Sequence, residues 1–269
     1  LLVASMTDAL RDKAVVGVGS NLSLAKGKLD MLKDVIKRVE AVKCQTVESI
    51  DLFKKVKSFY ELREAIKNSD WSEISKCLQA ESFKLLIEGD IGHEEFVAVK
   101  HAEEDYTVVK NLRAAIGQGA PEKLKNPQQS FLDYSTIRTE ELEMAIAFAT
   151  EVGCKSTESQ NLSKLADYIL RIRQCLECAN IKKAGGVCKD AFATDTINDE
   201  IEIVQTEYQN KCAMKSMLDA LENGKVEGDL GNLNLPGIKF HALQMCIHEA
   251  NAISPKTEEL DKLISSCTL

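Results

Sequence analysis

The 269-residue chain has little of what interrupts helices, with 4 Pro and 14 Gly, and aromatic residues make up only 5% of it. Folds rich in strands need turn residues such as Pro and Gly at short intervals, and long stretches of this chain contain neither. The same counts exclude collagen-like and low-complexity classes. Because 44% of the residues are apolar, a substantial core can form, and we predict an all-α fold.

Long apolar runs and an excess of basic residues are also missing. No run approaches the about 18 apolar residues of a membrane span, and residues 1–4 are too few for the apolar part of a signal peptide. The formal net charge is −8, whereas nucleic-acid binding relies on Lys and Arg. Residues 1–67 carry a balance of +4 and residues 68–269 one of −12. We expect neither a membrane span nor a nucleic-acid partner.

The chain repeats itself. Residues 5–36 align with residues 216–247 without a gap, and 13 of the 32 positions are identical, where chance gives about two. A second alignment, at an offset of 110, joins residues 42–52 to residues 152–162, with identities at Val42, Cys44, Glu48, Ser49 and Leu52. These offsets indicate a period of about 105 residues, with copies that begin near residues 5, 111 and 216 and a truncated last copy.

Half of this period is visible as well, because Ala-Leu or Ala-Ile pairs recur at Ala9-Leu10, Ala65-Ile66, Ala115-Ile116 and Ala220-Leu221. Each half has room for two helices, and helical pairs that bury their apolar faces only on stacked neighbours build solenoids. We therefore predict one continuous, α-solenoid-like array of antiparallel helices over residues 1–269, with about two and a half copies. The alternative is a duplicated bundle whose copies share one compact core.

Apolar residues at spacings of three and four predict the helices. The expected ranges are 29–42, 47–68, 72–88, 94–117, 139–152, 157–180, 194–223, 237–252 and 256–267. Thr46 and Ser156 are expected to cap the helices that follow them, and Pro255 suits the first turn of the last helix. The predicted buried faces of the two capped helices consist of Leu52, Val56, Phe59, Leu62 and Ile66, and of Leu162, Ala166, Ile169, Arg173 and Leu176.

The nine cysteines lack the dense spacing of a disulfide framework, which is typical of a reducing compartment and predicts a cytoplasmic protein. Cys175 and Cys178 have the spacing of half a zinc site, but Cys188 and Cys212 do not supply the second half. Cys175 also stands inside a predicted helix where other copies have Ala. We predict structural cysteines, and no metal or cofactor.

One predicted helix combines basic residues with an apolar stripe of Leu29, Leu32, Ile36 and Val39. Basic amphipathic helices are typical targets of calmodulin-like EF-hand proteins. The candidate partner-binding residues are Lys26, Lys28, Lys33, Lys37, Arg38 and Lys43. The other copies keep the apolar positions without the basic ones, which favours a core role for the stripe.

The pattern as a whole predicts a non-enzymatic helical-repeat scaffold or filament segment that binds proteins, including further copies of itself end to end. A chain that starts without Met and stops within a copy is expected to be part of a longer repeat protein. A first alternative is a target of a calmodulin- or centrin-like calcium sensor in a cytoskeletal or contractile assembly, associated with the cytoskeleton. A second is a helical-bundle enzyme or small-molecule carrier.

Overall fold

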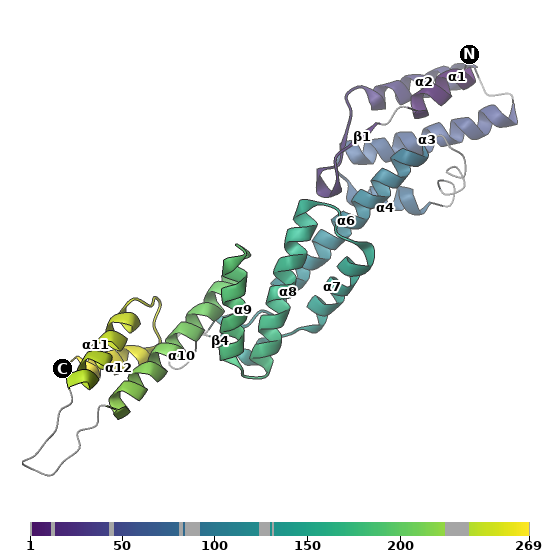
Figure 1. Ribbon diagram of the computed structural model, residues 1–269. Coiled ribbons are helices and arrows are strands. Elements are labelled where there is room, and N and C mark those ends of the chain that lie inside the picture. Colours follow the sequence, from purple (N-terminus) through teal and green to yellow (C-terminus); the bar gives the residue numbers. More distant parts are fainter. Residues whose placement is uncertain are drawn as a thin grey trace, which may run out of the picture. The chain divides into compact units, whose positions relative to one another are not determined.

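The computed structural model describes residues 2–11, 14–42, 46–80, 83, 92–123, 130, 132–223 and 237–268. Over these residues the chain is helical apart from turns and two short hairpins, so the all-α prediction is confirmed (Figure 1). It divides into two compact units. Unit 1 comprises Leu1–Asn111 and Phe148–Gln160, and unit 2 comprises Leu112–Ala147 and Asn161–Leu269. Within the described part, no helix is both long and apolar enough to cross a bilayer.

Unit 1 is built around one long helix. Its elements are α1 (Leu2–Arg11), β1 (Val15–Val16), a 3-10 turn (Gly19–Asn21), β2 (Ser23–Leu24), α2 (Lys28–Val42), α3 (Val47–Lys67), α4 (Trp71–Gln79) and the first part of α6 (His93–Gly117). Helices α1, α2 and α4 all pack on α3. The hairpin pairs Val15 with Leu24 in antiparallel register. The core contains the fully buried side chains of Leu10, Leu32 and Phe59.

Unit 2 holds most of the remaining helices. Its elements are β3 (Glu122–Lys123), β4 (Leu132–Asp133), a 3-10 turn (Tyr134–Thr136), α7 (Glu140–Val152), α8 (Thr157–Glu177), α9 (Ile181–Ala193), α10 (Asp199–Asn223), α11 (Gly237–Asn251) and α12 (Glu258–Cys267), with the end of α7 and the start of α8 assigned to unit 1. Helix α10 packs against α9, α11 and α12. The hairpin pairs Glu122 with Asp133 in antiparallel register.

Side-chain caps set where several helices begin, as the sequence predicts at two of them. Thr46 accepts a hydrogen bond from the backbone N–H of Ser49, and the Ser49 side chain completes a capping box. Ser156 accepts from the N–H of Ser159 in the same way. These caps satisfy backbone donors that have no partner within the helix.

Four of the predicted helix ranges need correction. Helix α4 ends at Gln79 because Ala80 leaves the helical conformation; of residues 81–88, only Phe83 lies among the described residues. The helix predicted at 157–180 ends at Glu177. The last helix begins at Glu258 with Thr257 as its cap, so Pro255 precedes its first turn.

The fourth error is larger: the range 194–223 starts five residues before α10, and no helix was predicted over residues 181–193, where the structure has α9. Gly185 and Gly186 stand in the middle of α9, and glycine is a poor helix former. Gly185 packs against the ring of Tyr208, so tertiary contact stabilises a helix that propensity disfavours.

Burial follows the same order in α3 and α8. Phe59, Leu62 and Ile66 are buried in α3, as predicted, and Leu52 is half-buried. Arg173 is buried in α8, also as predicted, but its counterpart at the offset of 110 is Arg63 and not Leu62. Both arginines are completely buried, although arginine is seldom buried unless it is paired.

Candidate functional site

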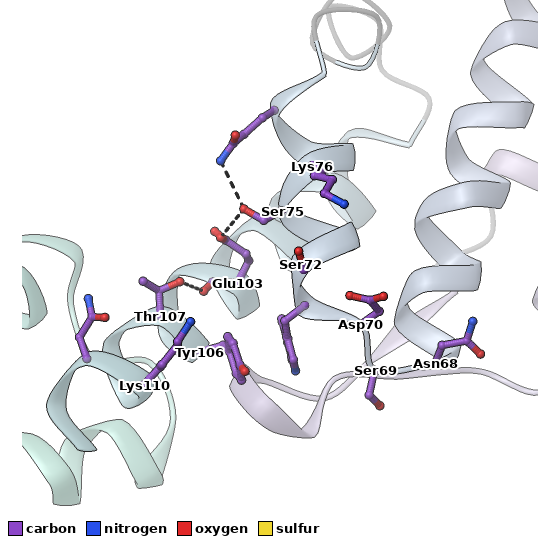
Figure 2. Close-up of a pocket in the computed structure, with 13 residues that line it drawn as sticks. Asn68, Ser69, Asp70, Ser72, Ser75, Lys76, Glu103, Tyr106, Thr107 and Lys110 are labelled. Carbon is purple, nitrogen blue, oxygen red and sulfur yellow. Dashed lines mark hydrogen bonds between the residues drawn. The ribbon is translucent and has the colours of Figure 1, made fainter. Parts of the chain in front are cut away.

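A groove of about 760 Å³ lies between α4 and α6 in unit 1 (Figure 2). The turn Asn68–Asp70 contributes to one end of it. One face of α4 supplies Trp71, Ser72, Ser75, Lys76 and Gln79, and one face of α6 supplies Glu103, Tyr106, Thr107, Lys110 and Asn111. The residues on each helix recur at intervals of three and four, which places them on a single face.

Two contacts join the walls of the groove. The Ser75 hydroxyl donates a hydrogen bond of 3.0 Å to a Glu103 carboxylate oxygen (Figure 2). The rings of Trp71 and Tyr106 stack with centroids 4.4 Å apart and planes 8° from parallel. Trp71 precedes Ser75, whereas Tyr106 follows Glu103, so the two helices run antiparallel. The groove therefore has Asp70 and Lys110 toward one end, and Lys76 and Glu103 toward the other.

Several polar side chains of the groove have no protein partner. Among the described residues, the side chains of Asn68, Ser72, Lys110 and Asn111 are exposed and make no hydrogen bond or ion pair. The other lysine, Lys76, pairs with a carboxylate outside the lining, that of Glu73, at 2.9 Å. This hydrogen bond and the charge of Glu73 raise the pKa of Lys76. The free amides and hydroxyl are available to a ligand.

The positions in unit 2 that correspond to the contact between Ser75 and Glu103 carry different residues. At an offset of 110 residues Ser75 corresponds to Gly185, and at an offset of 105 residues, the period of the repeat, Glu103 corresponds to Tyr208. A Cβ atom on Gly185 would stand 2.2 Å from the Tyr208 ring, so α9 and α10 touch at the position where α4 and α6 are joined by a hydrogen bond. Trp71 corresponds to Ile181, which removes the aromatic stack.

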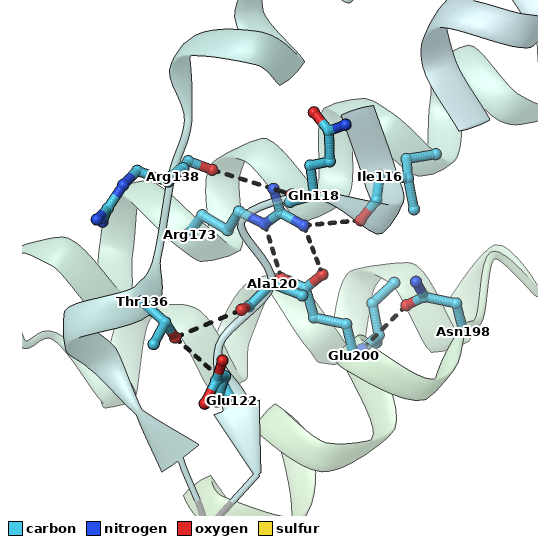
Figure 3. A network of polar contacts seen from close by, with 10 residues as sticks. Ile116, Gln118, Ala120, Glu122, Thr136, Arg138, Arg173, Asn198 and Glu200 are labelled. Carbon is cyan, nitrogen blue, oxygen red and sulfur yellow. Dashed lines mark hydrogen bonds and ion pairs between the residues drawn. The ribbon is translucent and has the colours of Figure 1, made fainter. Parts of the chain in front are cut away.

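Arg173 anchors several elements of unit 2 (Figure 3). Its guanidinium makes a bidentate contact with Glu200 of α10, with both hydrogen bonds at 2.9 Å. It also donates to the carbonyl oxygens of Ile116, Gln118 and Arg138, at 2.9, 2.6 and 3.0 Å. Burial raises the pKa of Glu200, while the guanidinium opposes that rise. The arginine thus holds the end of α6, the segment before α7 and the start of α10 together.

Arg63 makes the equivalent anchor in unit 1. It contacts Glu95 at the start of α6 through two hydrogen bonds of 2.8 and 2.7 Å. It donates to the carbonyl oxygen of Ala9 near the end of α1 at 3.4 Å, and to that of Lys28 at the start of α2 at 3.2 Å. Arg63 thus joins its own helix α3 to the end of α1, the start of α2 and the start of α6, just as Arg173 joins α8 to the end of α6, the segment before α7 and the start of α10.

A second buried polar contact also occurs twice. Oδ1 of Asp105, in α6, accepts hydrogen bonds from the N–H groups of Lys155 and Ser156 and from the Ser159 hydroxyl, at 2.8, 3.1 and 2.6 Å. In unit 2, Asn210 of α10 accepts from the N–H of Thr257 at 3.0 Å and donates to the carbonyl of Pro255 at 3.1 Å. Each contact fixes the N-terminus of a later helix to a long helix.

The predicted basic residues lie on α2 or just before it. Lys26, Lys33, Lys37 and Arg38 are exposed, Lys28 is half-buried, and Lys43 lies outside the described residues. Leu32 and Val39 of the apolar stripe are buried in the core of unit 1, together with Val35. The other two residues of the stripe, Leu29 and Ile36, are half-buried, so the stripe faces the core of unit 1 and the basic side chains lie around it.

The burial of two cysteines fits the structural role predicted for them. Cys175 and Cys188 are buried, and burial raises the pKa of Cys188 to about 12, which keeps its thiol neutral. Cys178 and Cys212 are exposed. Within the described ranges, no three His, Cys, Asp or Glu side chains come together as metal ligands.

Sequence reasoning missed both the groove and the arginine anchors. The anchors had a signal, because Arg63 and Arg173 are identical at the offset of 110 and interrupt an apolar stripe. The groove had none, since it depends on how far apart two helices stand. Comparisons of the chain with models of protein families, with curated proteins and with solved structures find no match.

Proposed function

We propose that the chain is a non-enzymatic helical-repeat scaffold that binds other proteins through exposed helix faces. Support comes from contacts that occur twice at the repeat offsets: Arg63–Glu95 and Arg173–Glu200, and the buried side chains of Asp105 and Asn210. The turns before α4 and α9 also match, with Ser69 at φ 54° and Ala179 at φ 53°. Repeats that interlock with their neighbours are the basis of helical arrays.

The observation that carries the function is the difference between α4–α6 and α9–α10. The buried anchors are the same in both copies, whereas the contacts between the two helix pairs differ: Ser75 and Glu103 stand beside a polar groove in one pair, and Gly185 packs on Tyr208 in the other. A scaffold needs a constant frame and variable surfaces, because binding residues on a rigid frame change without loss of the fold.

The alternatives fit less well. Capture by a calcium sensor requires an accessible apolar stripe, and Leu32 and Val39 are core residues. Small-molecule sites are enclosed and mostly apolar, whereas the groove is lined mainly by polar side chains. Protein binding is the function that such a surface supports best.

Photo-crosslinking tests the function. Benzoylphenylalanine is placed at the exposed positions Ser72 in the groove, Lys182 on α9 and Lys37 on α2, and each variant is irradiated in an extract of the source organism. We expect a discrete protein adduct from at least one position, which disappears when excess unsubstituted chain competes. The absence of a competed adduct from all three positions would overturn the scaffold proposal.

Small-angle scattering tests the array itself. Stacked repeats give a rod-like profile, because each copy contacts only its neighbours. A compact profile would favour the duplicated bundle instead and would contradict the array.

A further inference from the structure

We propose that the end of α10 and the neighbouring face of α11 bind an amphipathic helix of a partner protein, and that this helix carries an arginine among its apolar residues. This inference rests on the proposed scaffold function and adds the surface and the kind of partner. The surface is defined by Ala220 and Leu221 of α10 and by Leu243 of α11, and we call it the α10–α11 surface.

The α10–α11 surface repeats one that is buried in unit 1. At the offset of 211 residues, Leu10 and Leu32 correspond to Leu221 and Leu243. Leu10 is 1% exposed and Leu32 is fully buried, whereas Leu221 is 37% exposed and Leu243 is half-buried. Phe240, one turn before Leu243, is 66% exposed. The same apolar side chains are therefore covered in one copy and accessible in the other.

The core at this end of unit 2 stops short of the α10–α11 surface. Among the described residues, the buried cluster contains Met217 but neither leucine of the surface. Met6, the counterpart of Met217, belongs in unit 1 to a cluster that continues through Leu10. Unit 1 therefore has a contribution to its core that unit 2 lacks at this place.

The second half of α3 makes that contribution. Helices α1 and α2 both pack on α3. Phe59, Leu62 and Ile66, all from residues 57–67 of α3, belong to the same buried cluster as Leu10. An amphipathic helix is therefore what covers this surface where it is buried.

Helix α12 takes the place of only the first half of α3. At the offset of 211 residues its bounds correspond to residues 47–56, and its capping residue Thr257 corresponds to Thr46, the cap of α3. It packs on α10 and α11, as α3 packs on α1 and α2. Among the described helices of unit 2, none corresponds to residues 57–67. We therefore place the partner helix beside α12, over the α10–α11 surface.

The helices that cover the matching surfaces in the first two copies share one residue pattern. A fully buried arginine has apolar residues four positions and one position before it, and three positions after it. These positions lie on one face of a helix. The residues are Phe59, Leu62, Arg63 and Ile66 in α3, and Ile169, Ile172, Arg173 and Leu176 in α8.

The end of α10 favours the arginine of such a helix. The carbonyl groups at the C-terminus of a helix carry a partial negative charge. Helix α6 has no basic residue in its last turn and receives Arg173 at the carbonyl oxygen of Ile116. Helix α10 also has no basic residue in its last turn, and Glu222 stands where α1 has Arg11. A cation from the partner is the complementary charge.

The probe is an amidated peptide with the sequence of residues 57–67, labelled with fluorescein at its N-terminus and titrated with the full chain by fluorescence polarisation. Leu221→Glu in the chain should weaken binding more than about tenfold, because it removes an apolar contact and places a charge in the interface. The control Met144→Glu makes the same kind of change at an exposed position of α7 and should alter binding less than about twofold.

Changes in the peptide test the arginine. Arg63→Glu should weaken binding about tenfold or more, through loss of a hydrogen bond from a charged donor. Lys57→Glu changes the net charge by the same amount at a position that is exposed in α3, and should have an effect of less than about twofold.

Circular dichroism checks that the chain variants fold, and sedimentation of the chain alone should show a monomer. The proposal is overturned if the peptide does not bind, if the Leu221→Glu and Met144→Glu chains bind it alike, or if the two peptide variants bind alike. It is also overturned if the chain forms a dimer that Leu221→Glu abolishes, because a second copy would then cover the surface. A competed adduct at Ser72, Lys182 or Lys37 alongside such a result would leave the scaffold function standing and remove only this surface.

Discussion

The helix pairs α4–α6 and α9–α10 occupy matching places in the two copies and meet their neighbours differently. In the first pair Ser75 donates to Glu103 and a groove remains beside the contact. In the second pair Tyr208 covers Gly185, and the nitrogen of Lys189 lies 5.3 Å from the centre of the Tyr208 ring. The contrast shows that matching positions of the two helix pairs carry different kinds of contact, a side-chain hydrogen bond in one and a ring packed on a glycine in the other.

At the buried arginines the two copies agree. A buried arginine pairs with each long helix: Arg63 of α3 contacts Glu95 of α6, and Arg173 of α8 contacts Glu200 of α10. The stability of the frame and the shape of the surface therefore depend on separate residues. This separation can be tested by substitutions that act on one and leave the other intact.

The largest expected effect comes from the buried arginines. Arg173→Leu leaves the Glu200 carboxylate buried without its cation and should cost about 3–5 kcal/mol in the free energy of unfolding. Arg63→Leu should cost a similar amount by leaving Glu95 unpaired. Urea unfolding followed by circular dichroism measures both losses, and hydrogen exchange shows whether each loss is confined to its own unit.

The control for this experiment removes both charges. Arg173→Leu/Glu200→Leu should recover part of the loss, because no charge remains buried without a partner, while the carbonyl oxygens of Ile116, Gln118 and Arg138 still lack their donor. If Arg173→Leu alone cost less than about 1 kcal/mol, the arginine would not be an anchor of the fold.

The next effect concerns the closed contact. Gly185→Ser introduces a Cβ atom 2.2 Å from the Tyr208 ring and should cost about 1–3 kcal/mol through overpacking. Gly186→Ala is the matched control, since its Cβ would meet nothing within 4 Å, and it should stabilise α9 by about 0.5–1 kcal/mol. Thermal unfolding of the two variants measures the loss of stability in the first and the gain in the second. Equal effects would show that the glycines matter only through helix propensity.

A smaller effect is expected at the aromatic stack beside the groove. Trp71→Ile, which installs the residue found at position 181, should weaken the coupling to Tyr106 by about 0.5–1.5 kcal/mol. A double-mutant cycle with Tyr106→Leu measures this coupling in urea. A coupling energy near zero would mean that the stacked rings contribute only through their separate burial.

The smallest effect at neutral pH is expected at Asp105. Burial alone would raise its pKa, but hydrogen bonds from Ser156, Ser159 and the N–H of Lys155 outweigh burial and hold the pKa below its usual value. The carboxylate therefore adds stability above the unfolded pKa of about 4, and this stability is lost as pH falls through the lower folded pKa. Asp105→Asn should cost under about 1 kcal/mol at pH 7 and remove that part of the acid sensitivity. Urea unfolding between pH 7 and pH 3 measures the slope.

The reciprocal change sharpens the comparison of the two copies. Asn210→Asp replaces the amide that donates to the carbonyl oxygens of Thr206 and Pro255, so the new carboxylate faces two acceptors. Its folded pKa should be raised, and the variant should gain stability as pH falls. Parallel slopes for Asp105 in the natural chain and for Asn210→Asp would contradict the stated hydrogen-bond patterns.

Much of the local structure was predictable because it depends on neighbours in sequence. Spacings of three and four placed the buried faces of α3 and α8, and the capping residues Thr46 and Ser156 marked where these helices begin. Helix α9 was missed because its stability comes from contact with Tyr208, which lies more than twenty residues further along. Arg173 was placed correctly on a buried face, but its pairing with Glu200 required the fold.

The sequence by itself determined that this protein is helical and which faces of its helices are apolar, and its self-alignment predicts a repeat with a period of about 105 residues. These properties follow from local periodicity and from alignment of the chain with itself. Only the tertiary structure decided that Arg63 and Arg173 join four segments each, and that a groove opens at Ser75 while the matching place closes at Gly185. The physical reason is that burial of a charge and the distance between two helices depend on side chains contributed from remote parts of the chain.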